Sequence, residues 1–225
     1  MTAALVLVAL LAADDPKPRE LAGWGTVVDP DGDCDAKLAG DELTLTVPAT
    51  PHNLNPKLGR LNGVRVLRPV AGDFTAKVKV SGKFEPGAKK TSPAGAVPFV
   101  GAGLLVWADR DHFVRLERCA WALPDGRRAC YPPLFEAVAG GEVHDLNKPG
   151  VLAGEFLGGG DVWLRLDRHG DTLTARFGRD GKAWEVAGEF TAELPAKVRV
   201  GVSAVNTSDA RFPATFGGFK VVADD

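Results

Sequence analysis

The chain is poor in the residues and motifs that most often reveal a particular chemistry. Its 225 residues include one tyrosine, one methionine, three cysteines and four histidines. It contains no Gly-x-Ser-x-Gly elbow, His-Glu-x-x-His motif or Cys-x-x-Cys pair, so the usual signatures of serine hydrolases, zinc proteases and zinc fingers are missing. The net charge is −2, from 27 basic and 29 acidic residues. Since no basic stripe is interleaved with aromatic residues, we expect no nucleic-acid partner.

Hydrophobic runs long enough to span a membrane are also missing, and a leucine-rich apolar stretch stands at the start of the chain. Leu5–Leu11 is followed by Ala12-Ala13 and a polar, proline-containing segment, the order of a signal-peptide core and its cleavage site. The run is too short to span a bilayer. We therefore expect residues 1–13 to be a signal peptide and the mature chain to be secreted or periplasmic, without a transmembrane segment. The alternative is an N-terminal strand of a cytosolic protein, since no Lys or Arg precedes Lys17.

The three cysteines allow one disulfide and leave one thiol over. Cys119 and Cys130 flank a Pro-Asp-Gly turn at residues 124–126, so they can face each other across a hairpin in an exported protein. We expect this disulfide, with two reduced thiols as the alternative. Cys34, in an aspartate-rich loop, is then unpaired.

Alternation of apolar and polar residues dominates the rest of the chain. It is clearest in residues 43–47, 74–80, 162–178 and 198–202. Such alternation is typical of strands with one buried face. Residues 162–178 form two such runs joined by a glycine-containing turn, and we expect Trp184 to pack over the Asp-Gly turn that follows them.

Gly-, Pro-, Asn- and Asp-rich segments separate these runs, as loops do. Many short strands joined by such loops predict an all-β fold, a two-sheet antiparallel β-sandwich, as one domain over residues 14–225. The stretch 134–160 shows no clear pattern, and its part 142–150 is expected to be a long surface loop.

Seven segments together resemble a known family. They are Gly23-Trp-Gly, Asp29-Pro-Asp-Gly-Asp-Cys, Val47-Pro-Ala-Thr-Pro-His-Asn-Leu, Arg65-Val-Leu-Arg-Pro-Val-Ala-Gly-Asp-Phe, Gly101-Ala-Gly-Leu-Leu-Val-Trp-Ala-Asp, His112-Phe-Val-Arg-Leu-Glu-Arg and Asp180-Gly-Lys-Ala-Trp. In this order they resemble the concanavalin A-like lectin and glucanase sandwiches. More narrowly, they resemble the regulation-of-enolase type of domain, which is similar to the C-terminal sandwich of some β-xylosidases. The resemblance runs from about residue 22 to the C-terminus; it implies a concanavalin A-like jelly roll and assigns no activity.

Four aspartates stand at alternate positions in one short loop: Asp29, Asp31, Asp33 and Asp35. Oxygen ligands of this kind are those that calcium prefers. The loop is not an EF-hand, because Cys34 stands where that loop has its glycine and no Glu closes it. We take Asp29, Asp31 and Asp33 as candidates for a Ca²⁺ site at the sandwich rim, with a solvated aspartate-rich turn as the alternative.

The main ligand-binding candidates are Trp107, Phe113, Arg115 and Glu117, in two adjacent strand-like segments. If the aliphatic residues between them face the core, these four share the opposite face of the sheet. An aromatic ring beside charged, planar groups is the usual composition of a sugar site. The alternative is that this face is also buried, with an Arg115–Glu117 pair and Trp107 as a packing residue.

Two further polar sets are candidates of lower specificity. His52, Asn62 and Arg65 lie with Asn53 in or beside one loop, where function is often placed. Turn formation by the asparagines and loop anchoring by Arg65 are the alternative. A second outward set, which is more often a solvated sheet face, consists of Trp163, Arg165, Thr174 and Arg176.

A catalytic centre is not evident in the sequence. Glycosidases need two carboxylates at a defined separation, and Glu117, Glu136, Glu142 and Asp145 are scattered along the chain. We therefore expect an exported, non-catalytic binding module whose ligand is carbohydrate. The alternatives are a glycan-active hydrolase and a structural or protein-interaction domain of the cell envelope.

Overall fold

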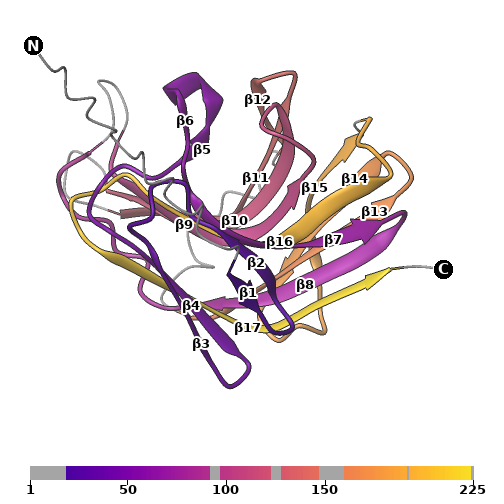
Figure 1. Cartoon of the computed structure of the whole chain (residues 1–225), viewed down its shortest axis with the longest axis horizontal. Helices are drawn as coiled ribbons and strands as arrows, with labels where there is room; N and C mark the ends of the chain where they lie inside the picture. The colour runs from indigo at the N-terminus through magenta and orange to yellow at the C-terminus, as the bar shows by residue number, and fades with distance from the viewer. Residues whose placement is uncertain (1–18, 92–96, 123–127, 147–159, 192, 224–225) are drawn as a thin grey trace, which may run out of the picture.

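Two antiparallel sheets are stacked face to face in the structure, a computed structural model (Figure 1). It describes residues 19–91, 97–122, 128–146, 160–191 and 193–223, so the predicted signal peptide lies outside the described residues. Among the residues described, no helix has the length and apolar character needed to cross a membrane. The predicted two-sheet antiparallel β-sandwich is confirmed.

One sheet has eight strands. In spatial order they are β1 (Glu20–Leu21), β2 (Gly25–Val28), β7 (Val64–Ala71), β16 (Lys197–Asn206), β9 (Phe99–Trp107), β10 (His112–Ala122), β11 (Arg128–Ala139) and β12 (Glu142–Asp145). The other has seven. They are β15 (Glu185–Thr191), β14 (Thr172–Gly178), β13 (Val162–His169), β8 (Phe74–Ser81), β17 (Phe212–Ala223), β4 (Glu42–Val47) and β3 (Asp35–Ala39).

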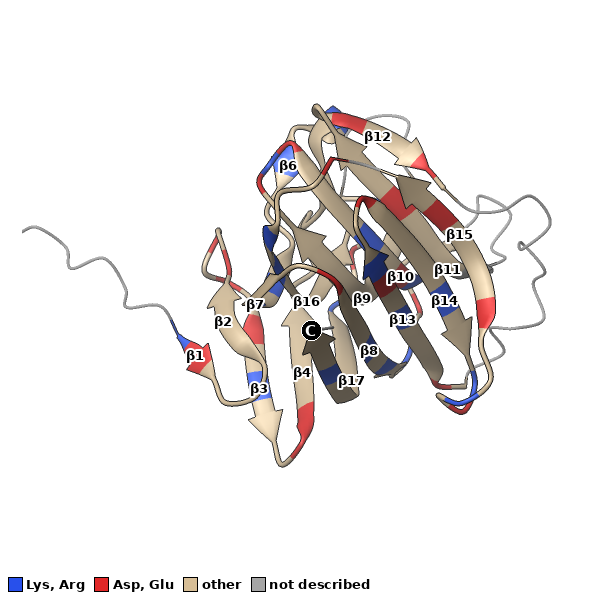
Figure 2. Ribbon diagram, turned by 90° about the vertical axis from the view of Figure 1, so that its right-hand side faces the viewer, with Lys and Arg blue, Asp and Glu red and all other residues tan. Residues whose placement is uncertain are grey.

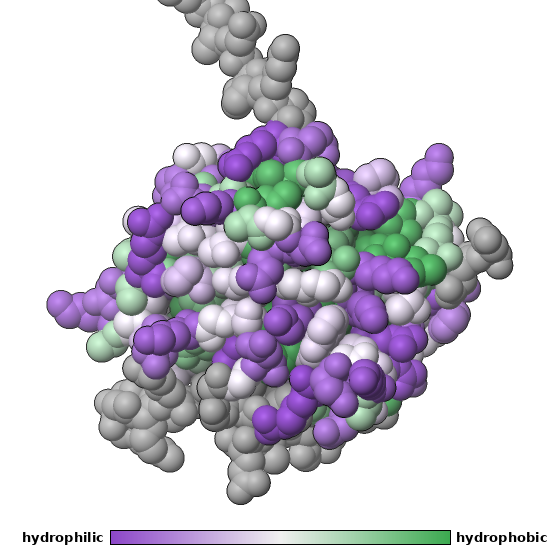
Figure 3. Space-filling view, turned by 90° about the horizontal axis from the view of Figure 1, so that it is seen from below, coloured by the Kyte–Doolittle hydropathy of each residue, from purple (hydrophilic) through white to green (hydrophobic). Residues whose placement is uncertain are grey.

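Strands of the seven-stranded sheet follow the alternation of the sequence because only one of their faces is buried. In β8 the buried Phe74, Ala76, Val78 and Val80 alternate with half-buried residues such as Lys77. Seen from the side of this sheet, the molecule is mainly hydrophilic, with smaller hydrophobic patches (Figure 3). Basic and acidic residues are interspersed over the ribbon without a stripe of one sign (Figure 2).

The eight-stranded sheet is instead covered on both faces. Strand β9 is buried along its whole length. Leu104 and Val106 belong to the main core between the sheets, whereas Leu105 and Trp107 belong to a second hydrophobic cluster on the outer face, the face turned away from the seven-stranded sheet. This outer cluster also receives Leu54, from a small hairpin that lies over the sheet.

That hairpin, called the flap below, comprises residues 54–61. It consists of β5 (Leu54–Asn55), the short helix η1 (Pro56–Leu58) and β6 (Arg60–Leu61). The side chain of Asn55 accepts a hydrogen bond from the Lys57 backbone N–H and so begins the helical turn. Figure 1 shows the flap and β12 standing on the same side of the eight-stranded sheet.

The last two strands occupy interior places in the two sheets. Strand β16 lies between β7 and β9 in the eight-stranded sheet, and β17 lies between β8 and β4 in the seven-stranded sheet. Each therefore joins strands that come from distant parts of the chain.

The expectation for residues 134–160 needs correction. Residues 134–139 belong to β11, and Glu142–Asp145 form β12 rather than part of a long loop, with a tight Gly140-Gly141 turn between the two strands. Strand β11 showed no alternation because both its faces are covered: Phe135 packs in the main core and Leu134 in the outer cluster. Residues 147–159 lie outside the described part of the chain.

The disulfide expected between Cys119 and Cys130 also needs correction. Cys119 is a free, buried thiol in β10. Its partner in the β10–β11 register is Tyr131, whereas Cys130 pairs with Ala120. The hairpin therefore does not set the two cysteines directly opposite each other. Burial raises the pKa of the Cys119 thiol well above its usual value, with the Glu117 carboxylate as a smaller cause.

Candidate functional site

The aromatic and charged residues of β9 and β10 meet on the outer face of the eight-stranded sheet. Phe113 pairs with Trp107 in the register, and both rings lie in the outer cluster. Their centroids are 4.8 Å apart in a stacked arrangement. The guanidinium of Arg65 lies 4.4 Å from the centroid of the Trp107 ring. Trp107 is 5% exposed, so it is enclosed by its neighbours, as in the packing alternative.

Arg115 and Glu117 form the buried charged part of this face. Arg115 Nη1 lies 3.4 Å from Glu117 Oε2. Its Nε donates to Glu136 Oε2 at 2.9 Å, and its Nη2 donates to the same oxygen. Burial raises the pKa of Glu117, and Arg115 offsets this only in part. Burial alone would lower the pKa of Arg115, but the two carboxylates outweigh it and raise that pKa.

A first cavity of about 280 Å³ opens beside this network, between the flap and β11. Arg115 and Glu136 supply its charged lining, and Phe99 and Trp121 supply its aromatic lining. These two rings are 4.9 Å apart and tilted by 47°. The remaining lining residues are Asn53, Asn55, Leu58, Val97, Leu134 and Thr207. Glu117 does not line the cavity and is fully buried.

A second cavity of about 520 Å³ lies on the other side of the flap. Its lining residues are Pro30, Asp31, Pro56, Gly59, Arg60, Leu61, Asn62, Arg65, Trp107 and Arg110. Arg65 donates from Nη1 to the carbonyl of Gly63 at 3.0 Å. Burial, together with the charge of Arg199, lowers the pKa of Arg65 to about 10.

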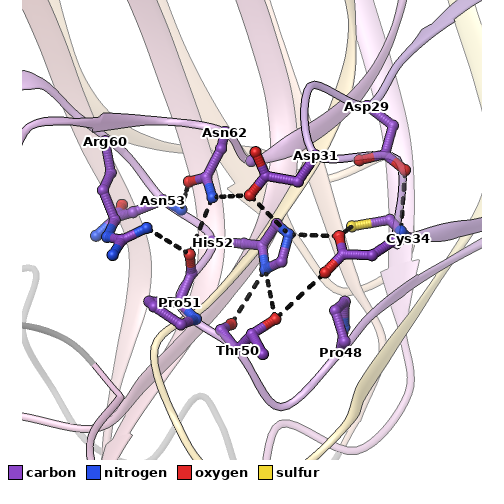
Figure 4. A network of polar contacts seen from close by, with 12 residues as sticks. Asp29, Asp31, Cys34, Pro48, Thr50, Pro51, His52, Asn53, Arg60 and Asn62 are labelled. Atoms are coloured by element: carbon purple, nitrogen blue, oxygen red, sulfur yellow. Dashed lines mark hydrogen bonds and ion pairs between the residues drawn. The ribbon is translucent and has the colours of Figure 1, made fainter.

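The structure brings two separately predicted groups together. His52 is 1% exposed and directs Nε2 at the aspartate loop, residues 29–34, with Asp33 Oδ1 at 2.8 Å and Asp31 Oδ2 at 3.6 Å. Asn62 Nδ2 donates to Asp31 Oδ2 at 2.6 Å. Figure 4 shows His52 between Asp31 and Thr50, with Asn62 beside Asp31.

Asp29 has a different partner within the aspartate loop. One of its carboxylate oxygens accepts the backbone N–H of Cys34 at 2.9 Å. The thiol of Cys34 lies 3.9 Å from Asp33 Oδ1. Burial raises the pKa of Cys34, and the charges of Asp29 and Asp33 raise it further. The metal-ligating atoms of Asp33, Cys34 and His52 all lie within 4.8 Å of one another.

The second outward set lies on the seven-stranded sheet, away from both cavities. Arg165 and Arg176 each donate from Nε to the carboxylate of Asp167, at 2.8 and 3.1 Å. Lys77 lies over the ring of Trp163, 5.8 Å from its centroid. Arg165 lies 5.8 Å from the ring centroid of Trp184. Arg165 and Arg176 thus form ion pairs with Asp167 on the surface of this sheet.

Sequence reasoning missed several residues that line the first cavity. Trp121 continues the β10 alternation of Phe113, Arg115 and Glu117 past the irregularity in the β10–β11 pairing. The same alternation could therefore have identified Trp121 as a residue of this face. Glu136 is opposite Arg115 in the β10–β11 register. That pairing was hidden because the part of β11 from residue 134 onward was not predicted.

Comparison with known proteins gives fold relationships. No family model and no curated protein sequence matches the chain. A protein of unknown function from Saccharomyces cerevisiae is similar in structure, with a TM-score of 0.63, 18% identity, and coverage of 90% of this chain and 97% of that one.

Two bacterial proteins share the fold over part of their length. The GH43 protein BlXynB from Bacillus licheniformis matches with a TM-score of 0.53 and 16% identity, over 84% of this chain and 38% of that chain. A xylan β-1,4-xylosidase from Bacillus halodurans matches with a TM-score of 0.53 and 16% identity, over 95% of this chain and 41% of that chain. This chain therefore spans about two fifths of those proteins. At these identities the likenesses show the fold alone, a two-sheet antiparallel β-sandwich.

Proposed function

We propose that the chain binds carbohydrate in the first cavity, between the flap and β11. The observation that carries this proposal is the composition of the cavity wall: the rings of Phe99 and Trp121 stand beside Arg115 and Glu136. Aromatic rings stack on the apolar face of a sugar, while planar charged groups and amides bind its hydroxyls. Asn53 adds an amide to the same wall.

The buried charge network favours binding over hydrolysis. A glycosidase presents two carboxylates to the scissile bond. Here Glu117 is fully buried behind the cavity, and both Glu117 and Glu136 hold the same arginine, Arg115. Such an arrangement keeps the Arg115 guanidinium fixed for hydrogen bonding to a ligand. A hydrolase therefore remains the alternative that this geometry supports less.

A protein-interaction domain is the other alternative. It would be expected to present a flat, aliphatic sheet face. The outer face of the eight-stranded sheet instead carries the flap and two cavities with charged residues in their walls. Export of the chain and its narrower relationship to the regulation-of-enolase type stay predictions.

A glycan screen with two tryptophan variants tests the proposal. Trp121→Ala removes a ring from the cavity wall, and the matched control, Trp184→Ala, removes a half-buried ring next to the start of β15, beside the opposite sheet. We expect selective binding of a glycan by the native protein, at least a tenfold loss of affinity in Trp121→Ala and no loss in Trp184→Ala. Absence of binding by the native protein across the screen, or equal losses in both variants, would contradict the proposal.

A further inference from the structure

The junction of His52 with the aspartate loop combines three kinds of metal-binding atom. His52 supplies a ring nitrogen, Cys34 a sulfur, and Asp31 and Asp33 carboxylate oxygens. They come from two loops that the sandwich brings together. We propose that this junction is a Zn²⁺ site with His52, Asp33, Cys34 and Asp31 as ligands, independent of carbohydrate binding.

The orientation of His52 is the first argument. With a metal ion on Nε2, Nδ1 of His52 would carry the proton and donate it to the carbonyl oxygen of Thr50, 3.1 Å away. Its Nε2 then faces the oxygens of Asp33 and Asp31 at 2.8 and 3.6 Å. A histidine that donates one N–H to a backbone carbonyl and directs its other nitrogen at carboxylates has the arrangement found at metal sites.

The spacing of the donor atoms is the second argument. Zn–N and Zn–O bonds of about 2.0 Å and Zn–S bonds of about 2.3 Å place tetrahedral donors about 3.3–3.5 Å apart. The Nε2–Oδ2 separation of His52 and Asp31 is 3.6 Å, and the Sγ–Oδ1 separation of Cys34 and Asp33 is 3.9 Å. The ligating atoms of Asp33, Cys34 and His52 lie within 4.8 Å of one another, so side-chain movements would bring these three around one ion, with Asp31 as the fourth donor.

Supporting hydrogen bonds hold two of the ligands in place. Asn62 donates to Asp31 Oδ2 at 2.6 Å, and the Thr50 hydroxyl donates to Asp33 Oδ2 at 3.5 Å. His52 is 1% exposed, whereas the side chains of Asp31 and Asp33 are 47% and 43% exposed. The site is thus anchored on its buried side and open to an incoming ion on the other.

The donor set also decides between zinc and calcium. Calcium takes six to eight oxygen ligands, and Asp29, expected from the sequence to take part, instead accepts the backbone N–H of Cys34. Imidazole nitrogen and thiolate sulfur suit zinc. The calcium site predicted from the four alternating aspartates is therefore replaced, in this proposal, by a zinc site that uses two of them.

Metal binding is tested on protein without a polyhistidine tag, freed of metal and kept reduced. We expect an equimolar Zn²⁺ site by calorimetry and a melting temperature raised by about 5–10 °C at hundredfold excess over Kd, with no comparable shift for Ca²⁺. Co²⁺ in place of Zn²⁺ should give a thiolate-to-cobalt charge-transfer band. Absence of that band in the native protein, or binding of Ca²⁺ and not Zn²⁺, would overturn the proposal.

Matched variants locate the site. Asp33→Asn and Cys34→Ser should each weaken Zn²⁺ binding at least tenfold, and Cys34→Ser should also abolish the cobalt band. The control is Asp35→Asn, the same change two residues along, since Asp35 pairs with Arg211 at 2.7 Å instead. Unchanged Zn²⁺ affinity in folded Asp33→Asn and Cys34→Ser, with folding checked by circular dichroism, would overturn the assignment. If a variant does not fold, the presence or absence of the thiolate-to-cobalt band in the native protein tests whether Cys34 is a ligand.

Discussion

The charged residues buried on the outer face of the eight-stranded sheet differ in how they are compensated. Arg115 is held by Glu117 and Glu136, whereas Arg65 is held by backbone carbonyls and the ring of Trp107. Taking a charge out of water is costly unless partners replace the water. Where the partners only partly replace the water, the pKa shifts in the direction that favours the uncharged form. It is raised for Glu117 and lowered for Arg65.

The raised pKa of Glu117 predicts a particular pH dependence of stability. In the window between its unfolded pKa near 4.5 and its higher folded value, the folded protein holds a proton that the unfolded chain has lost. Glu117 therefore makes stability fall as pH rises through this window. The Glu117→Gln variant lacks this pH dependence. Its free energy of unfolding minus that of the native protein should therefore increase with pH. Urea unfolding of both proteins between pH 4 and pH 8 measures this; a constant or falling difference would contradict it.

Trp107 and Trp121 should separate stability from binding. Trp107 is enclosed between Phe113 and Arg65, so Trp107→Ala is expected to reduce the free energy of unfolding by about 3–5 kcal/mol. Trp121 is half-buried at the cavity wall, and Trp121→Ala should cost less stability and more glycan affinity. Urea unfolding alongside glycan binding measures both effects. A larger stability loss for Trp121→Ala would contradict the enclosed position of Trp107.

At the scale of elements, the flap shapes both cavities. It supplies Asn55 and Leu58 to the first and Pro56 and Arg60 to the second. Leu54 attaches it to the sheet through the outer cluster and is fully buried there. Loss of this anchor should therefore disturb the cavity walls as well as the packing.

Leu54→Ala is expected to lower both stability and ligand affinity. Removal of a buried leucine side chain costs about 2–5 kcal/mol, and the loosened flap should weaken glycan binding severalfold. Leu43→Ala is the matched control, because Leu43 is equally buried but lies in the seven-stranded sheet. It should lose similar stability and keep its affinity, measured at a temperature where both variants are folded. Equal affinities in the two variants would show that the flap does not shape the site.

The elements also show what the sequence can and cannot predict. Strands with one face toward solvent, such as β8 and the β13–β14 hairpin, were predicted from the alternation of apolar and polar residues. The part of β11 from residue 134 onward was missed because both its faces are covered. The face shared by Trp107 and Arg115 followed from strand geometry, but the contact of His52 with Asp33 did not. That contact joins two loops that are separate in the sequence, and no local sequence pattern predicts a contact of this kind.

At the scale of the whole molecule, one ion pair links the flap to β12. Lys57 Nζ lies 2.9 Å from Glu142 Oε2 and so joins η1 to β12; the flap and β12 stand on the same side of the eight-stranded sheet (Figure 1). Lys57 lowers the pKa of Glu142 through a hydrogen bond and its charge. Both side chains are more than half exposed, and such pairs open readily in water.

This link should affect the rates of ligand exchange more than stability. Glu142→Gln removes the ion pair, so we expect both association and dissociation of the glycan to become severalfold faster, with little change in Kd. The charge-reversed double variant, Lys57→Glu with Glu142→Lys, should restore the native rates. Stopped-flow measurement of the tryptophan fluorescence on mixing with the glycan gives both rates. Rates that do not respond to either variant would show that the Lys57–Glu142 pair does not control access to the cavity.

The interior positions of β16 and β17 have a consequence for how the molecule is made. Before residues 197–223 leave the ribosome, the first sheet is split into β1-β2-β7 and β9-β10-β11-β12, and the second into β3-β4 and β8-β13-β14-β15. Neither half of the sandwich has a complete partner to pack against, and apolar strand edges stay open. The sandwich can therefore form only after residues 197–223 have been synthesised, and its many long-range pairings make that step slow and dependent on protection from aggregation.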